Sequence, residues 1–138
     1  MHSSLRILVV DDEPIACKRL KASLTQEGVS VETAPGGAEA VRMLEQEPFD
    51  IVVTDICMDH VDGIAVLDAV NRLHPSSKTI LITGYASVEV AREALAKGAY
   101  DFIAKPFQPK DLRAIIDKAA KELRGRRSGG RAGDSRAG

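Results

Sequence analysis

Five polar residues follow apolar runs in this sequence, and together their side chains could carry out metal-assisted phosphoryl chemistry. They are Asp11, Asp12, Asp55, Thr83 and Lys105. Two carboxylates about 4 Å apart repel by roughly 4 kcal/mol at an effective dielectric constant near 20, so three clustered acids call for a cation. An all-oxygen site with few protein ligands favours Mg²⁺, and no EF-hand spacing is present. Mg²⁺ beside a lysine, a hydroxyl and a free carboxylate is typical of phosphoryl transfer, with the carboxylate as covalent acceptor.

Each of these residues has a simpler explanation when it is considered alone. Asp11 and Asp12 could cap the helix that follows them. Asp55 and Thr83 could each cap a turn, and Lys105 could be a solvated surface charge. Several such coincidences at one edge of a sheet would be improbable, so the expected positions of the strands decide between these interpretations.

The expected strands are short apolar runs, too brief for ordinary helices. They cover residues 5–10, 29–33, 50–55, 78–83 and 99–104. The second run alternates apolar and polar residues, as a half-exposed strand near a sheet edge does. The third run ends at Asp55, which places this acid where a buried strand gives way to a loop.

Amphipathic stretches separate these strands and predict five helices. The first begins at Pro14, carries Ala16, Leu20 and Leu24 with Cys17 beside them, and ends at Gly28. The second carries Ala40, Val41 and Leu44 and ends before Pro48, and the third covers 64–73. The fourth is capped by Ser87, carries Val88, Ala91 and Leu95, and stops at Lys97-Gly98, and the last covers about 109–124. The alternation predicts an α/β fold, a parallel sheet with helices on both faces. Ligands bind at the carboxyl ends of the strands in such sheets, which is where the five polar residues are expected.

The composition is that of one ordinary globular domain. The chain has 138 residues, 44% of them hydrophobic and 28% charged. It contains no apolar run of the roughly 18 residues that a membrane span needs, and its start does not resemble a signal peptide. Cys17 and Cys57 form no metal-binding or disulfide pattern, so we expect free thiols in a reducing cytoplasm.

The C-terminal segment differs from the rest of the chain. Residues 125–138 contain four arginines and one aspartate, a charge of +3 that leaves −4 on the remainder of a chain with net charge −1. This glycine-, arginine- and serine-rich segment has no large apolar residue, so we expect a disordered basic tail after a folded domain at 4–124. Contact of the tail with nucleic acid is a weaker alternative than a solvated end.

Several motifs resemble the receiver (CheY-like) domain of bacterial two-component response regulators. They are Leu8-Val9-Val10-Asp11-Asp12-Glu13, Thr54-Asp55 with Met58 and Asp62-Gly63, Thr83-Gly84-Tyr85, and Lys105-Pro106-Phe107, and the match covers about residues 5–123. The resemblance implies a flavodoxin-like (βα)5 fold, a doubly wound five-stranded sheet in the order 2-1-3-4-5. Residues 83–88 and 97–102 also look like NtrC-type receivers, which precede ATPase modules in sigma-54-dependent activators.

The resemblance also implies a role for each site residue. Asp55 would accept a phosphoryl group from a phosphohistidine on a sensor histidine kinase. Asp12 would bind Mg²⁺ directly and Asp11 largely through water, with Asp55 and the backbone carbonyl of Cys57 as further ligands. Lys105 would pair with a phosphoryl oxygen, and its peptide bond to Pro106 would be cis.

A conformational switch is implied as well. Thr83 would turn its hydroxyl toward the phosphoryl group, leaving space for Phe102 to move from an exposed to a buried position. The surface of the fourth helix, fifth strand and last helix would then control a downstream effector or pair in a homodimer. For Phe102 the alternative is a simple core aromatic. Asp59 stands where this family commonly has proline, which leaves the Mg²⁺ affinity and the phosphate lifetime open.

Two other functions compete with this signalling switch, which would catalyse only its own phosphorylation and dephosphorylation. One is a small Mg²⁺-dependent phosphohydrolase with Asp55 as nucleophile, although the chain has no evident substrate-specificity insertion. The other is an interaction module that is never phosphorylated. No membrane contact is expected, and nucleic acid would be reached only indirectly, through a longer transcription regulator. Whether the chain stands alone or is part of such a regulator stays open.

Overall fold

The computed structural model describes residues 5–56, 63–84 and 88–128. Strands and helices alternate along the chain: β1 (Leu5–Val10), α1 (Pro14–Leu24), β2 (Val29–Ala34), α2 (Gly37–Gln46), β3 (Ile51–Asp55), α3 (Gly63–Leu73), β4 (Lys78–Thr83), α4 (Val88–Ala96), β5 (Asp101–Ala104) and α5 (Pro109–Ser128). The strands form one parallel sheet in the order β2-β1-β3-β4-β5. The predicted flavodoxin-like architecture is therefore confirmed.

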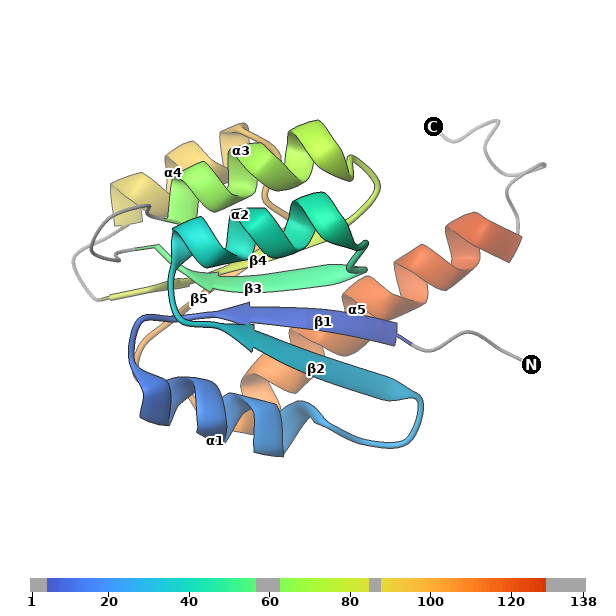
Figure 1. Cartoon of the computed structure of the whole chain (residues 1–138), viewed down its shortest axis with the longest axis horizontal. Coiled ribbons are helices and arrows are strands. Elements are labelled where there is room, and N and C mark those ends of the chain that lie inside the picture. The colour runs from blue at the N-terminus through green and yellow to red at the C-terminus, as the bar shows by residue number, and fades with distance from the viewer. Residues whose placement is uncertain (1–4, 57–62, 85–87, 129–138) are drawn as a thin grey trace.

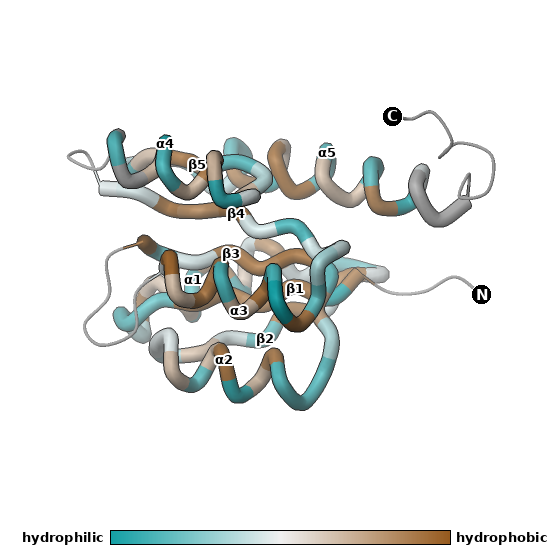
Figure 2. Tube along the Cα trace, turned by 90° about the horizontal axis from the view of Figure 1, so that it is seen from above, coloured by the Kyte–Doolittle hydropathy of each residue, from teal (hydrophilic) through white to brown (hydrophobic). Residues whose placement is uncertain are grey.

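The sheet is the middle of three layers. Helices α1 and α5 cover one face, and α2, α3 and α4 cover the other (Figure 1). Successive residues of a strand point to opposite faces, so β1 contributes Ile7 and Val9 to the core under α1 and α5, and Leu8 and Val10 to the core under α2 and α3. In Figure 2 the strands are coloured mainly as hydrophobic, whereas hydrophilic and hydrophobic residues alternate along the helices. This pattern explains why β1 and β3 read as continuous apolar runs.

The strand register brings the carboxyl ends of four strands to one edge of the sheet. Val10 pairs with Thr54, Asp55 pairs with Ile82, and Thr83 pairs with Ala104. These ends lie on the left in Figure 1, opposite the N-terminus of the described chain. The polar residues that follow the strands are thus positioned at a common edge, as the sequence predicted.

The structure corrects some details of the sequence reading. Leu95, expected on the buried face of its helix, is 38% exposed, and Ala94 is buried there instead. In α1, Cys17 rather than Ala16 belongs to the buried stripe. A helix has one narrow apolar stripe, and small or thiol side chains fill it where the sheet lies close.

The two ends of the last βα unit also differ from expectation. Strand β5 has only four residues and begins at Asp101. Helix α5 continues to Ser128, four residues past the predicted domain boundary, because each added residue gains a backbone hydrogen bond and arginine favours helices. Residues 129–138 of the predicted tail lie outside the described residues. None of the described helices combines the length and apolar character that crossing a bilayer requires.

Candidate functional site

Asp55 ends the central strand β3 and forms an ion pair with Lys105. The carboxylate is largely buried, with Asp55 only 7% exposed. The Nζ of Lys105 donates a hydrogen bond to Oδ2 of Asp55 at 3.0 Å, across 50 residues of sequence. The Lys105 amide donates to the carbonyl of Thr83 at 2.8 Å, which extends the β4–β5 pairing to the lysine. The Lys105–Pro106 peptide bond is cis, as the family resemblance implied.

The two consecutive acids after β1 have different environments. Asp11 is 1% exposed, whereas Asp12 is exposed. The Oδ1 of Asp11 accepts a hydrogen bond from the amide of Glu13 at 2.9 Å. Its Oδ2 is buried without a hydrogen-bond partner in the described part of the chain. A buried carboxylate oxygen without a partner is costly, and a nearby cation would offset that cost.

The charges of the site are electrostatically coupled. Burial raises the pKa of Asp11, and the negative charge of Asp55 raises it further, while Lys105 opposes the shift. Burial lowers the pKa of Lys105, but the hydrogen bond and charge of Asp55 outweigh this effect and leave that pKa raised. Lys105 therefore remains an ammonium ion at neutral pH and neutralises part of the acidic charge.

The expected three-acid cluster is not assembled in this structure. Over the ranges that the structure describes, no three histidine, cysteine or acidic side chains are grouped so that they could hold a metal ion. The ammonium group of Lys105 lies beside Asp55 instead, and it neutralises charge where a further carboxylate would add repulsion. The donor chemistry still fits Mg²⁺, because the Oδ2 of Asp11, which no other described residue hydrogen-bonds, is a hard oxygen ligand. Cys57, whose carbonyl was assigned to the metal, lies outside the described residues.

The two expected switch residues occupy neighbouring strands. Thr83, at the end of β4, is 3% exposed. Phe102, on the edge strand β5, is partly buried and packs against the cluster of Ile56, Leu67, Leu81 and Ala91 with Ala94 and Ala99. Phe102 is therefore half-buried rather than fully exposed in this structure.

Sequence reasoning did not reveal two features beside the site. One is a cavity of about 230 Å³ between α1 and the segment after β5, which shares Asp11 and Lys105 with the site and has Leu20 and Phe107 among its apolar walls. The other is the close approach of Gly63 to the main chain of Asp55. Asp62-Gly63 was part of the family motif, but only the packing shows what this glycine touches.

Comparison with known proteins places this geometry in a family. Residues 7–117 match the response regulator receiver domain family. The chain is 39% identical over 118 residues to the transcriptional regulatory protein ZraR of Escherichia coli K12, which covers 86% of this chain and 27% of ZraR. It is 36% identical over 121 residues to GlrR of the same organism, covering 88% of this chain and 27% of GlrR. The chain thus spans about a quarter of the length of these curated relatives.

Solved structures agree with this assignment. A CheY-like response regulator receiver domain protein from Methanospirillum hungatei superimposes with a TM-score of 0.83 at 35% identity, covering 88% of this chain and 98% of that protein. The receiver domain of NtrX from Brucella abortus gives a TM-score of 0.78 at 33% identity, covering 83% of this chain and 98% of that domain. The family match, the sheet order and the site at the strand ends lead to one conclusion. This chain belongs to the response regulator receiver domain family of two-component systems.

Proposed function

We propose that the domain accepts a phosphoryl group on Asp55 from a phosphohistidine of a sensor histidine kinase. The observation that carries this proposal is the 3.0 Å ion pair between Lys105 and Asp55, next to an Asp11 carboxylate with one buried oxygen that has no hydrogen-bond partner among the residues that the structure describes. A nucleophilic carboxylate with an adjacent fixed cation and a second acid suited to Mg²⁺ is the equipment of phosphoryl transfer.

In the transfer step, a carboxylate oxygen of Asp55 attacks phosphorus. An O–P bond forms while the N–P bond of the phosphohistidine breaks, and the imidazole nitrogen leaves with the electron pair. Lys105 lies beside the acceptor as an ammonium ion, so it can exchange its carboxylate partner for a phosphoryl oxygen. Because this cation is held in place before the reaction, little reorganisation accompanies the development of charge.

Asp11, Asp12, Asp55 and the backbone carbonyl of Cys57 would hold Mg²⁺. When bound, the ion supplies positive charge that neutralises the phosphoryl oxygens. The support from this chain is the buried Oδ2 of Asp11, which has no hydrogen-bond partner in the described ranges. A raised pKa of Asp11, caused first by burial and then by the charge of Asp55, is the expected signature of an acid that a cation would satisfy.

Phosphorylation would shift a two-state equilibrium on one side of the molecule. The Thr83 hydroxyl would turn toward the new phosphoryl group, and Phe102 would become more buried. Phe102 already packs partly against the apolar cluster beneath α4, so a small movement is enough to bury it. The altered surface would be the one that α4, β5 and α5 form together.

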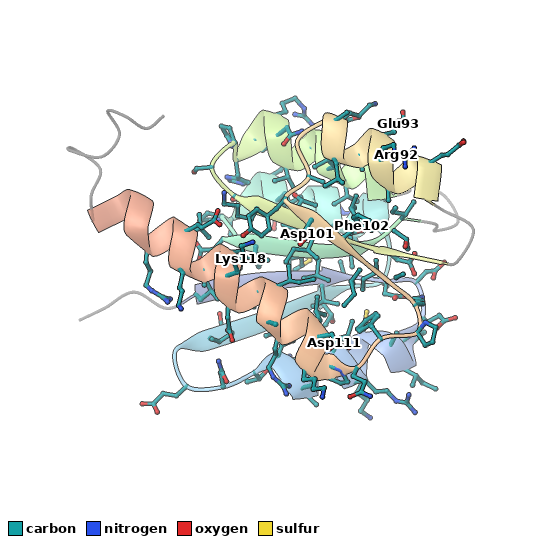
Figure 3. The ribbon with its side chains drawn as sticks, turned by 180° about the vertical axis from the view of Figure 1, so that it is seen from behind. Arg92, Glu93, Asp101, Phe102, Asp111 and Lys118 are labelled. Carbon is teal, nitrogen blue, oxygen red and sulfur yellow. The ribbon has the colours of Figure 1, made fainter. Side chains whose placement is uncertain are left out.

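That surface carries charges of both signs. Figure 3 shows side chains on its three elements: Arg92 and Glu93 on α4, Asp101 and Phe102 on β5, and Asp111 and Lys118 on α5. Such a mixed surface can pair with an effector or with a second copy of the chain through complementary charges. We propose a cytoplasmic setting, where a kinase and a reduced Cys17 thiol are available, and contact with nucleic acid only through an attached effector.

The kinase must reach the edge of the sheet where Asp55 lies. Ile15, at the start of α1, is 67% exposed. The cavity of about 230 Å³ opens beside the same edge through Asp11 and Lys105. The cavity, which contains Asp11 and Lys105 among its lining residues, supports docking of the phosphodonor protein at this edge.

Phosphorylation by acetyl phosphate tests the proposal. Intact-protein mass spectrometry should show a gain of one HPO₃ group with acetyl phosphate and Mg²⁺, and none with EDTA or in Asp55→Asn. Failure of the wild-type chain to form the adduct, with Asp55→Asn behaving alike, would favour the unphosphorylated interaction module. Continuous release of phosphate from many equivalents of a phosphate monoester would instead favour the phosphohydrolase.

A further inference from the structure

Gly63, the first residue of α3, lies directly against the main chain of Asp55. A Cβ atom on Gly63 would be 2.5 Å from the carbonyl oxygen of Asp55 and 2.7 Å from the Cα of Ile56. Ordinary van der Waals contacts of a Cβ begin at 3.4 Å. Both neighbours are main-chain atoms, which cannot rotate away as a flexible side chain could. Only a residue without a side chain fits between α3 and the end of β3.

Backbone conformation does not account for this glycine. Among the described residues, the glycines with positive φ are Gly28 and Gly98, so Gly63 has a φ that alanine can adopt. Alanine is also the better helix former, and at an open position in a helix the change would raise stability. The close approach to Asp55 is therefore the physical reason for a glycine at this position.

Hydrogen bonds hold the same piece of main chain from several sides. The amide of Gly63 donates to the carbonyl of Ile56 at 2.9 Å, and the amide of Ile56 donates to the carbonyl of Ile82 at 2.9 Å. The hydroxyl of Thr54 donates to the carbonyl of Asp55 at 3.1 Å. The backbone that carries the acceptor carboxylate is thus fixed between β4 on one side and α3 on the other.

We propose that Gly63 is a positioning residue for phosphorylation of Asp55, an inference that rests on the proposed function. Without a side chain at this position, α3 can hold the Asp55 backbone where its carboxylate meets Lys105. Lengthening the 2.5 Å contact to 3.4 Å in Gly63→Ala would displace main-chain atoms by about 0.9 Å. A misplacement of about 1 Å costs roughly 10²-fold in rate, so we expect Gly63→Ala to be phosphorylated about 10- to 100-fold more slowly.

The initial rate of adduct formation with acetyl phosphate and Mg²⁺ tests this inference. Gly36→Ala is the matched control, because Gly36 is the N-cap residue of α2 and a Cβ there would have no neighbour within 4 Å in the described part of the chain. Its rate should stay within about twofold of wild type. A Gly63→Ala chain as fast as a reactive wild type would refute the inference alone. A wild type that forms no adduct would refute the proposed function, and this inference with it.

A second control separates positioning from loss of stability. Ile51→Val removes a buried methylene at the opposite end of β3 and lowers stability without touching the acceptor. At temperatures where each variant is folded, Ile51→Val should keep the wild-type rate while Gly63→Ala is slow. Equal slowing in both variants would show that Gly63 acts only through stability and would overturn the proposal.

A measurement on the unaltered chain decides the question if Gly63→Ala does not fold. Adding Mg²⁺ and beryllofluoride, which mimics a phosphoryl group, should shift the amide NMR resonance of Gly63 and leave unchanged that of Gly28, which lies beside Leu5 at the opposite edge of the sheet. An unshifted Gly63 resonance in a chain that binds beryllofluoride would contradict the proposed positioning contact between Gly63 and the acceptor.

Discussion

Replacing Asp11 by asparagine should stabilise the Mg²⁺-free domain, although it removes a residue of the proposed site. The Oδ2 of Asp11 is buried and has no hydrogen-bond partner among the described residues, while its Oδ1 accepts from the amide of Glu13 at 2.9 Å. Asparagine has the same shape and can keep the second interaction. The substitution therefore removes a buried negative charge that Asp55 also repels.

The expected gain follows from three opposing contributions. A buried ion with poor compensation costs several kcal/mol, whereas a buried amide left without a partner costs about 1–3 kcal/mol. The side chain of Lys105 is 41% exposed, so losing its attraction to Asp11 reduces the gain in stability by about 1 kcal/mol at most. The variant should thus be more stable by about 1–2 kcal/mol, a rise in melting temperature of about 3–8 °C.

The pH dependence provides an independent check on the cause. The folded-state pKa of Asp11 is raised above its ordinary value of 3.8, so ionisation of this group costs folding free energy. Asp11 has no such cost below its unfolded-state pKa, where it is protonated in both states. The cost grows as the pH rises through the raised folded-state pKa. The difference between Asp11→Asn and wild type should accordingly shrink toward acidic pH.

Urea unfolding of both chains in EDTA, from about pH 4.5 to about pH 8, measures this difference. Subsequent addition of Mg²⁺ should stabilise the wild type by mass action and the variant much less. A variant less stable than wild type by more than about 1 kcal/mol, or a difference that does not change with pH, would refute the reasoning.

Three further predictions concern the rest of the fold. Leu67→Ala, which empties a fully buried position in the cluster between α3 and β4, should cost about 2–5 kcal/mol in urea unfolding; a loss under about 1 kcal/mol would contradict the packing. Gly125→Ala, at a position in α5 with no neighbour within 4 Å, should add about 0.5–1 kcal/mol in thermal unfolding, and a decrease would exclude a helix there. In a Cys57→Ser background, Cys17 should react with thiol reagents much more slowly in the native state than in urea, because burial raises its pKa; equal rates would show an accessible thiol.

Much of the fold was predictable because its elements arise from local patterns. The runs 5–10 and 78–83 coincide with β1 and β4, since a strand buried on both faces is a short apolar run bounded by polar residues. Asp55 and Thr83 are the last residues of their strands, and Asp11 and Lys105 directly follow theirs, so the sheet topology alone brings these residues to one edge. Their chemical types were sufficient to indicate phosphoryl chemistry before any contact was known.

Other features depend on distances between segments that are remote in sequence. Nothing local distinguishes the buried Asp11 from the exposed Asp12, because the direction in which the chain leaves β1 sets their difference. Leu95 fits an apolar stripe by spacing and is nevertheless 38% exposed, since the orientation of α4 on the sheet selects Ala94.

The site shows the same division. The packing of α3, β3 and β5 brings Lys105 within 3.0 Å of Asp55. The same packing leaves no room for a methyl group between Gly63 and the main chain of Asp55. Residue types and periodicity encode which elements form and which groups they carry, because those depend on near neighbours. The interatomic distances that position the acceptor join segments 8 to 50 residues apart in the sequence. The packing of the helices against the sheet determines these distances.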